Sequence, residues 1–321
     1  MFHSLRTVSH LSGYMASLAV LGFSLVTFAG CNIDELDHSR QEKRPQTNDE
    51  KVFESIQHEG GSIEKNKAGH AVKIELNGTG ASGAKLKDLE ATEDIKYLKL
   101  SGKEVTDSTL PSFKKLPNLR VLGLDNTIIT DKTLARLPQL EKLEELYLAH
   151  TPITDKGLAY IAKLPKLRKL RIKGTEITGK GLEQLAKLST LKELDLSFST
   201  VITDKDLTKL APLVGLQKLN LYNTAVSDQA IKNLAPLKNL KWLNLDKTKV
   251  TDKGLPSLEA FPKLTFLHLG SNDPITDKGV ETLVKLKQLE ELHVTDTLIT
   301  SVGVETLREK LPKCKVVEVR E

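Results

Sequence analysis

Aromatic rings, imidazoles and short polar side chains gather between residues 220 and 293. They are Asn220, Tyr222, Trp242, Asn244, Asp246, Phe266, His268 and His293. Aromatic residues make up only 4% of the chain, and its sole tryptophan lies in this stretch. Rings surrounded by polar groups are typical of protein interfaces and of platforms on which sugars stack. These side chains can form one site only if the elements that carry them place them on one surface.

Motifs of the common catalytic and cofactor-binding sites are absent from the sequence. It contains no GxSxG, no HExxH, no Walker loop and no paired cysteines at metal-ligand spacing. His268 and His293 could share a metal ion, but no third ligand is evident, and two solvated imidazoles are the simpler interpretation. We therefore predict a protein without catalytic activity, resident metal or cofactor.

A repeat of 24 or 25 residues organises most of the chain. Segments such as PITDKGL (152–158) recur, with their shared threonine or serine at positions 106, 130, 154, 178, 203, 227, 251, 276 and 300. An alternation such as Leu146-Tyr147-Leu148 precedes each copy and predicts a short strand with one buried face. The same phase extends from 74–76 to 317–319 and gives eleven strands. After each copy, apolar residues at three-residue spacing predict a short helix.

The pattern LxxLxLxxTxITDxGLxxLxxL, from about Ala71 to Arg320, resembles the leucine-rich repeat family. The resemblance implies an α/β solenoid in which a curved parallel sheet of about eleven short strands lies inside and short helices lie outside. It also implies protein recognition as the commonest use. The ITDxGL ending is similar to that of the cysteine-containing subfamily in F-box receptors, whose ubiquitin role would not suit an exported chain.

Two recurring polar positions have predicted structural roles. The aspartates Asp131, Asp155, Asp204, Asp228, Asp252 and Asp277 are expected to cap helices, since a calcium site needs several oxygens converging on one point. Where the family often has asparagine after the strand, this chain usually has threonine, and we expect a ladder of buried hydroxyls. These threonines are Thr127, Thr151, Thr175, Thr224, Thr248 and Thr297.

The first thirty residues have the composition of an export signal. No charged residue occurs between Arg6 and Cys31, and the intervening stretch is apolar with small residues at its end. Phe28-Ala29-Gly30-Cys31 resembles the lipobox of bacterial lipoproteins, which implies cleavage before Cys31 and a lipid on its thiol. An uncleaved anchoring helix and ordinary secretion remain open. All three place the remaining chain outside the cytoplasm, and the first predicts a lipid-anchored protein of the bacterial cell envelope.

The sequence divides into four predicted parts. Residues 1–30 form a signal peptide of the lipoprotein type, and the charged segment 31–50 is a flexible tether. Residues 51–76 form an N-terminal cap made of a helix plus a hairpin, and residues 77–321 hold the repeats. Cys314 occupies an apolar position of the last repeat, where we expect a buried thiol.

The eight aromatic, imidazole and polar residues between 220 and 293 all fall beside the buried strand leucines. In such a sheet these positions point to the concave face. Lys169, Arg171 and Lys173 form a basic row there, bordered by acidic residues that partly neutralise it. The net charge of +5 is a small excess over many compensating charges, so we expect no nucleic-acid partner.

We predict that the concave face binds a protein partner through this set of residues. Two alternatives stay open. In the first, the rings only shield neighbouring strands, and the chain is a structural scaffold or spacer of the envelope. In the second, the same rings bind a glycan.

Overall fold

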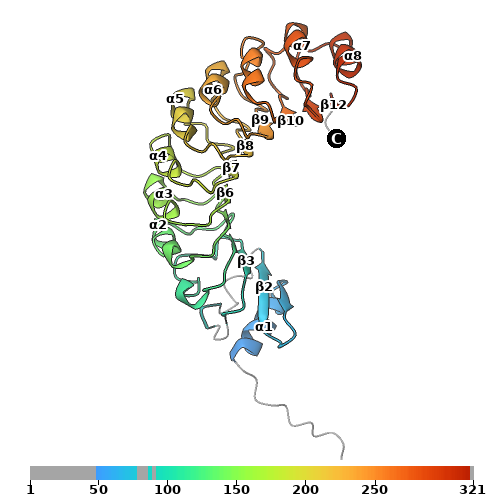
Figure 1. The fold of residues 1–321 in the computed structure, drawn as a ribbon. Helices are drawn as coiled ribbons and strands as arrows, with labels where there is room; N and C mark the ends of the chain where they lie inside the picture. Colours follow the sequence, from blue (N-terminus) through green and yellow to red (C-terminus); the bar gives the residue numbers. More distant parts are fainter. Residues whose placement is uncertain (1–47, 78–85, 89–91, 319–321) are drawn as a thin grey trace, which may run out of the picture. The chain divides into compact units, whose positions relative to one another are not determined.

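The computed structural model describes residues 48–77, 86–88 and 92–318. In these residues, twelve strands form one sheet whose order follows the chain (Figure 1). The strands are β1 (Ser62–Lys65), β2 (Ala71–Leu76), β3 (Tyr97–Leu100), β4 (Val121–Gly123), β5 (Glu145–Tyr147), β6 (Lys169–Arg171), β7 (Glu193–Asp195), β8 (Lys218–Asn220), β9 (Trp242–Asn244), β10 (Phe266–His268), β11 (Glu291–His293) and β12 (Lys315–Val317). β1 is antiparallel to β2, and β2 to β12 are parallel. The predicted solenoid with eleven parallel strands is confirmed.

From α2 to α8, short helices lie on the outer side of the sheet, opposite its inner, concave face, whereas α1 lies at the N-terminal end (Figure 1). The α-helices are α1 (Asn48–His58), α2 (Asp131–Leu134), α3 (Asp155–Ile161), α4 (Leu182–Leu185), α5 (Asp204–Leu207), α6 (Asp228–Asn233), α7 (Asp277–Leu283) and α8 (Ser301–Lys310). The 3-10 helices are η2 (Leu86–Asp88), η3 (Phe113–Lys115), η4 (Leu137–Gln139), η5 (Thr208–Leu210) and η6 (Leu255–Ala260). The strand and helix leucines meet in one continuous core from Val52 to Val316, because no coil can bury its apolar face alone. None of the described helices has the length and apolar composition needed to cross a bilayer.

The N-terminal end of this core is covered by α1 and the β1–β2 hairpin. Val52, Phe53 and Ile56 of α1 are buried and belong to the same core. The helix begins at Asn48, inside the segment predicted as a tether. Asp49 and Glu50 lie in the first turn of this helix, where negative charge interacts favourably with the helix dipole. These acidic residues therefore mark the start of a helix and not a flexible tether. The predicted signal peptide and Cys31 lie outside the described residues.

At the C-terminal end, the predicted phase of the last strand is wrong by one residue. Val316 pairs with Leu292 and is buried, whereas Val317 lies beside His293 on the concave face. The reason is a shorter spacing in the last coil. Cys314 and the buried strand residue Val316 are two positions apart, whereas the equivalent Leu289 and Leu292 are three positions apart. Burial also raises the pKa of the Cys314 thiol to about 11, so it is a poor nucleophile at neutral pH.

The recurring aspartates join one coil to the next rather than capping their own helices. Thr154 is the N-cap residue of α3, and Asp155 is the first residue inside the helix. The Asp131 carboxylate accepts hydrogen bonds from the Thr154 backbone N–H at 3.0 Å and from Thr154 Oγ1 at 2.7 Å. The same arrangement joins Asp107 to Thr130, Asp155 to Thr178, Asp204 to Ser227, Asp228 to Thr251, Asp252 to Thr276 and Asp277 to Thr300. We call this row the aspartate ladder, and it corrects the prediction of helix caps.

The glycine of the repeated motif makes room for this ladder. A Cβ atom at Gly157 would lie 2.5 Å from the Asp131 Oδ1 atom of the preceding coil. Gly179 stands where the repeat has aspartate, so Thr203 lacks the usual acceptor. Thr203 instead donates its N–H and hydroxyl to Asp206 of its own helix, at 3.0 and 2.7 Å. The Asp206 carboxylate fills the space beside Gly179, 1.9 Å from where a Cβ would be.

The six threonine hydroxyls predicted to lie in the turns after the strands are found there, and Thr127, Thr151 and Thr224 are buried, whereas the other three are partly exposed. Each of these hydroxyls donates to a carbonyl three residues earlier in its own coil, as Thr127 Oγ1 does to Leu124 O at 2.8 Å. A hydroxyl on a short side chain reaches its own turn more readily than the next coil. Asn272 is the exception. Its longer amide accepts from the N–H and the hydroxyl of Thr248, at 2.9 and 3.1 Å, and donates to Leu245 O of the preceding coil at 2.8 Å.

Candidate functional site

The strand register brings most of the predicted binding residues together on the concave face. Across β8 to β11, one row of paired positions holds Lys218, Trp242, Phe266 and Glu291, and the next holds Asn220, Asn244, His268 and His293. Neighbouring strands lie about 4.8 Å apart, so side chains in one row are in contact range. Tyr222 and Asp246 follow β8 and β9, at the strand ends.

Two stacked pairs of rings, joined to each other by tilted contacts, form what we call the ring ladder: Trp242, Phe266, His268 and His293. The Trp242 and Phe266 rings are 4.9 Å apart and nearly parallel, at 10°. The two imidazoles stack at 4.5 Å and 13°, and Phe266 contacts His293 at 5.2 Å. All four side chains are half-buried. Because these rings pack against one another, the ladder is a fixed aromatic ridge, apolar at Trp242 and Phe266 and polar at the two imidazoles.

At least one nitrogen of each imidazole in the ladder has a protein partner. His268 Nδ1 accepts from the Gly270 N–H at 3.2 Å and lies 3.9 Å from an Asp246 carboxylate oxygen. His293 Nε2 lies 2.8 Å from Glu291 Oε1. No group of three or more His, Cys, Asp or Glu side chains able to hold a metal ion occurs in the described part of the chain. Asp246 Oδ1 is buried without a hydrogen-bond partner, which leaves an acceptor beside the ladder.

Tyr222 lies in a second aromatic group at the strand ends, and the central residue of this group, Phe198, was not predicted from the sequence. The Phe198 ring contacts Tyr222 edge-on at 5.1 Å and His150 at 6.2 Å, and the Lys173 ammonium lies 4.6 Å from its centre. Phe198 has a φ of 62°, in the left-handed region that a bulky residue rarely adopts. The sequence gives one indication of this left-handed turn: the equivalent positions of the neighbouring coils hold Gly174 and Asn223, residue types that adopt such a conformation readily.

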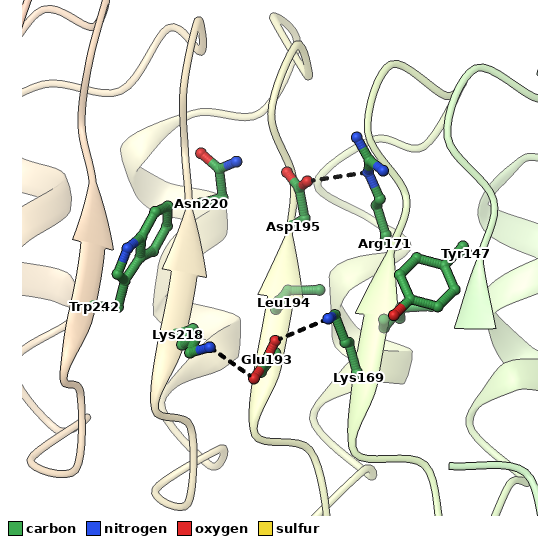
Figure 2. Close-up of a pocket in the computed structure, with 10 residues that line it drawn as sticks. Tyr147, Lys169, Arg171, Glu193, Leu194, Asp195, Lys218, Asn220 and Trp242 are labelled. Atoms are coloured by element: carbon green, nitrogen blue, oxygen red, sulfur yellow. Dashed lines mark ion pairs between the residues drawn. The ribbon is translucent and has the colours of Figure 1, made fainter. Parts of the chain in front are cut away.

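A hollow of about 400 Å³ borders the ring ladder, between the rings of Tyr147 and Trp242 (Figure 2). Asp195 and Asn220 are short side chains on the strands between these rings, and they leave the space open. Lys169, Arg171, Glu193 and Lys218 also line it. The hollow is therefore walled by an aromatic ring at each end and floored by charged groups.

The charges of the hollow neutralise one another, as predicted for the basic row. Glu193 pairs with Lys169 at 3.4 Å and with Lys218 at 3.1 Å. Arg171 pairs with Asp195 at 3.4 Å and with Asp125 at 3.2 Å. These contacts orient the side chains of β6 to β8 before any ligand arrives.

Tyr147 is held as a neutral hydroxyl at the other end of the hollow. Burial and the hydrogen bond that its hydroxyl donates to Glu145 raise the Tyr147 pKa well above its ordinary value. The ammonium groups of Lys99 and Lys169 lie over the ring, 4.8 and 5.3 Å from its centre. The two lysine ammonium groups hold the Tyr147 ring in place, and its protonated hydroxyl cannot serve as a base at neutral pH.

Comparison with known proteins agrees with this architecture. No curated protein matches the sequence at a significant level. Among solved structures, internalin C2 from Listeria monocytogenes has 30% identity and a TM-score of 0.51, with 65% of this chain and 84% of that chain covered. The TLR13–ssRNA13 complex has 20% identity and a TM-score of 0.55 over 77% of this chain and 41% of that chain, a likeness of fold alone. A leucine-rich repeat protein of Leptospira interrogans has 19% identity and a TM-score of 0.46, covering 70% and 66% of the two chains.

Residues 73–305 match the family described as "Leucine-rich repeat region". This match spans most of the coils described above, including the strands that carry the ring ladder and the hollow. The chain therefore belongs to the leucine-rich repeat family.

Proposed function

We propose that the protein is a non-catalytic recognition module whose concave face binds a protein partner. The observation that carries the proposal is the ring ladder lying directly beside the charged hollow on one sheet. An aromatic ridge bordered by oriented polar groups is the arrangement of an interface centre and its rim.

The rigidity of the face supports this proposal. The rings are held by stacking and the charged side chains by ion pairs, so a partner would immobilise few additional rotamers on binding. Each mobile side chain that must be ordered costs about 0.5–1.5 kcal/mol of affinity.

We further propose that this module acts at the bacterial cell envelope, anchored by a lipid on Cys31. The support is the apolar, uncharged N-terminal stretch and its Phe28-Ala29-Gly30-Cys31 ending. Mass spectrometry of the mature chain from membranes tests this. A lipid-modified N-terminal Cys31 is the expected result, and an intact Met1 would contradict it.

Crosslinking capture from envelope extract tests the binding proposal. The bait is the full chain, beside the Trp242→Ala/Phe266→Ala double variant. Tyr160→Ala, on the outer helix α3, is the matched control, because it removes a half-buried ring away from the concave face. A protein captured by wild type and the control but lost from the double variant is the expected result, with circular dichroism verifying the fold. Identical captures by all three would favour the scaffold alternative.

A glycan is the second candidate partner, and the position of Trp242 favours it. Phe266 stacks on this ring, which also forms one wall of a hollow with Tyr147 opposite. Sugars bind between aromatic walls of this kind through their apolar faces. Soluble peptidoglycan fragments would then change the fluorescence of Trp242 in the purified protein, with no protein partner present. Unchanged fluorescence across the titration would eliminate the glycan candidate.

A further inference from the structure

A second hollow lies on the edge of the solenoid where the chain enters β6 and β7, away from the concave face. It has a volume of about 480 Å³, and its lining includes Lys166, Arg168, Lys192, Ser189 and Thr190. The segments 162–168 (AKLPKLR) and 186–192 (AKLSTLK) that form it contain basic residues and no acidic residue. The hollow therefore concentrates positive charge in a chain whose overall charges nearly cancel.

The three cations of this hollow have no partner in the described part of the chain. Lys166, Arg168 and Lys192 make no ion pair or side-chain hydrogen bond there, unlike the cations of the concave face. The one carboxylate in the lining, Glu144, is bound by Arg120 at 2.8 Å. Equivalent lysines elsewhere on this edge are engaged. Lys142 donates to Asn118 Oδ1 at 2.6 Å, and Lys263 donates to Asn239 Oδ1 at 2.7 Å.

The backbone fixes the spacing of these cations. The N–H of Arg168 donates to Glu144 O at 2.8 Å, and the N–H of Lys192 donates to Arg168 O at 2.7 Å, so these residues occupy successive rungs of one ladder. The Thr190 hydroxyl donates to Leu167 O at 2.6 Å, which ties the two coils together at the hollow. The cations are thus held at neighbouring positions on a rigid edge, despite their mutual repulsion.

We infer that this hollow binds a phosphate group. Two ammonium groups, a guanidinium and the Ser189 hydroxyl offer several donors to one anion, and phosphate accepts several strong hydrogen bonds at once. A carboxylate ligand would leave positive charge uncompensated, whereas a phosphate balances more of it. The hollow contains no aromatic side chain on which a nucleic-acid base could stack, which favours an isolated phosphate over a nucleic acid. The phosphate belongs to a lipid headgroup or to a soluble phosphate ester. This inference does not depend on the concave-face proposal.

Titration of the full chain with three probes tests the inference. The probes are glycerol phosphate, short-chain phosphatidylglycerol below its micelle concentration, and short-chain phosphatidylcholine. The Lys166→Gln/Arg168→Gln/Lys192→Gln variant should bind the phosphate probes at least about tenfold more weakly than wild type, because charge-assisted hydrogen bonds are lost. The control variant Lys142→Gln/Lys263→Gln removes charge from the same edge and should stay within about twofold of wild type.

The probes also distinguish the sources of phosphate. Binding of glycerol phosphate alone identifies a soluble ester, and stronger binding of phosphatidylglycerol than of phosphatidylcholine identifies an anionic headgroup. A single-stranded oligonucleotide is titrated as a fourth probe. Three results would overturn the inference: equal binding by wild type and the triple variant, equal competition by acetate at matched ionic strength, or binding of the oligonucleotide when none of the other three probes binds. The Trp242→Ala variant should bind these probes as wild type does. The phosphate inference and the concave-face proposal are therefore tested by different variants, and either one can fail without the other.

Discussion

At the turn after the strands, most coils are joined to the next by the same pair of residues, whereas on the concave face neighbouring strands carry different side chains. The aspartate ladder repeats a carboxylate, a threonine or serine, and usually a glycine that makes room for it. On the concave face, β6 and β7 carry ion pairs, while β9 to β11 carry stacked rings. Repetition satisfies a requirement that every coil shares, so residues that depart from it are free to recognise a ligand.

Trp242→Ala should produce the largest effect, and on affinity rather than stability. Truncating an aromatic residue at the centre of an interface costs about 2–4 kcal/mol of binding energy, or roughly 30- to 1000-fold in Kd. The ring is only half-buried in the free protein, so unfolding should shift little. Titration against the captured partner measures the first effect and urea denaturation the second. A large loss of stability with unchanged affinity would make the ring ladder a structural element like the turns.

Asp131→Ala should show the reverse. It leaves the Thr154 N–H and hydroxyl without their acceptor at the junction of two coils. An orphaned donor in a part-buried place costs about 1–3 kcal/mol, so we expect about 2 kcal/mol of lost stability with unchanged partner affinity. Lys132→Ala, next to it and exposed, is the control and should change urea denaturation very little. Equal denaturation curves for the two variants would contradict the role given to the ladder.

Gly179→Ala should destabilise by about 1–2 kcal/mol, because overpacking forces neighbouring groups to move. Its Cβ would overlap the Asp206 carboxylate that replaces the missing ladder aspartate. At Gly215 the nearest obstacle is the flexible end of Lys192, at 2.8 Å, so Gly215→Ala should cost less. Thermal unfolding of both variants measures the difference. A smaller loss at Gly179 than at Gly215 would show that Asp206 moves aside freely.

Asp107 gives the ladder a pH dependence. Although burial alone would raise its pKa, the hydrogen bonds from Thr130 and Thr133 outweigh burial and hold the Asp107 pKa below its ordinary value of 3.8. Its stabilising contribution is therefore present above pH 3.8 and is lost as the pH falls through the lower folded-state value. Unfolding midpoints between pH 5 and pH 2 should fall less steeply for Asp107→Asn than for wild type. Parallel curves would exclude this residue as a source of acid sensitivity.

The sequence predicted what depends on neighbours along the chain and missed what depends on neighbours between coils. Leucine alternation is local, so the strands and the concave positions of Trp242 and Phe266 could be predicted. The contact of Asp131 with Thr154 spans 23 residues, and nothing local distinguishes it from a helix cap. Phe198 was missed because a bulky residue is unusual in a left-handed turn, and the turn is indicated only by Gly174 and Asn223 at the equivalent position of the neighbouring coils. The last strand shifted because one residue fewer precedes Val316 in its coil.

Lys218→Gln should give the smallest effect, and it distinguishes the two parts of the concave face. Lys218 is exposed and pairs with Glu193 at 3.1 Å, while Lys169 pairs with the other oxygen of the same carboxylate. Removing Lys218 leaves Glu193 with one cation, so stability should change by less than about 0.5 kcal/mol. If the partner reaches over the hollow, its association rate should change modestly, and the change should shrink in high salt because such contacts are screened. A loss of affinity as large as that of Trp242→Ala, and independent of salt, would place the centre of the interface in the charged hollow instead of the ring ladder.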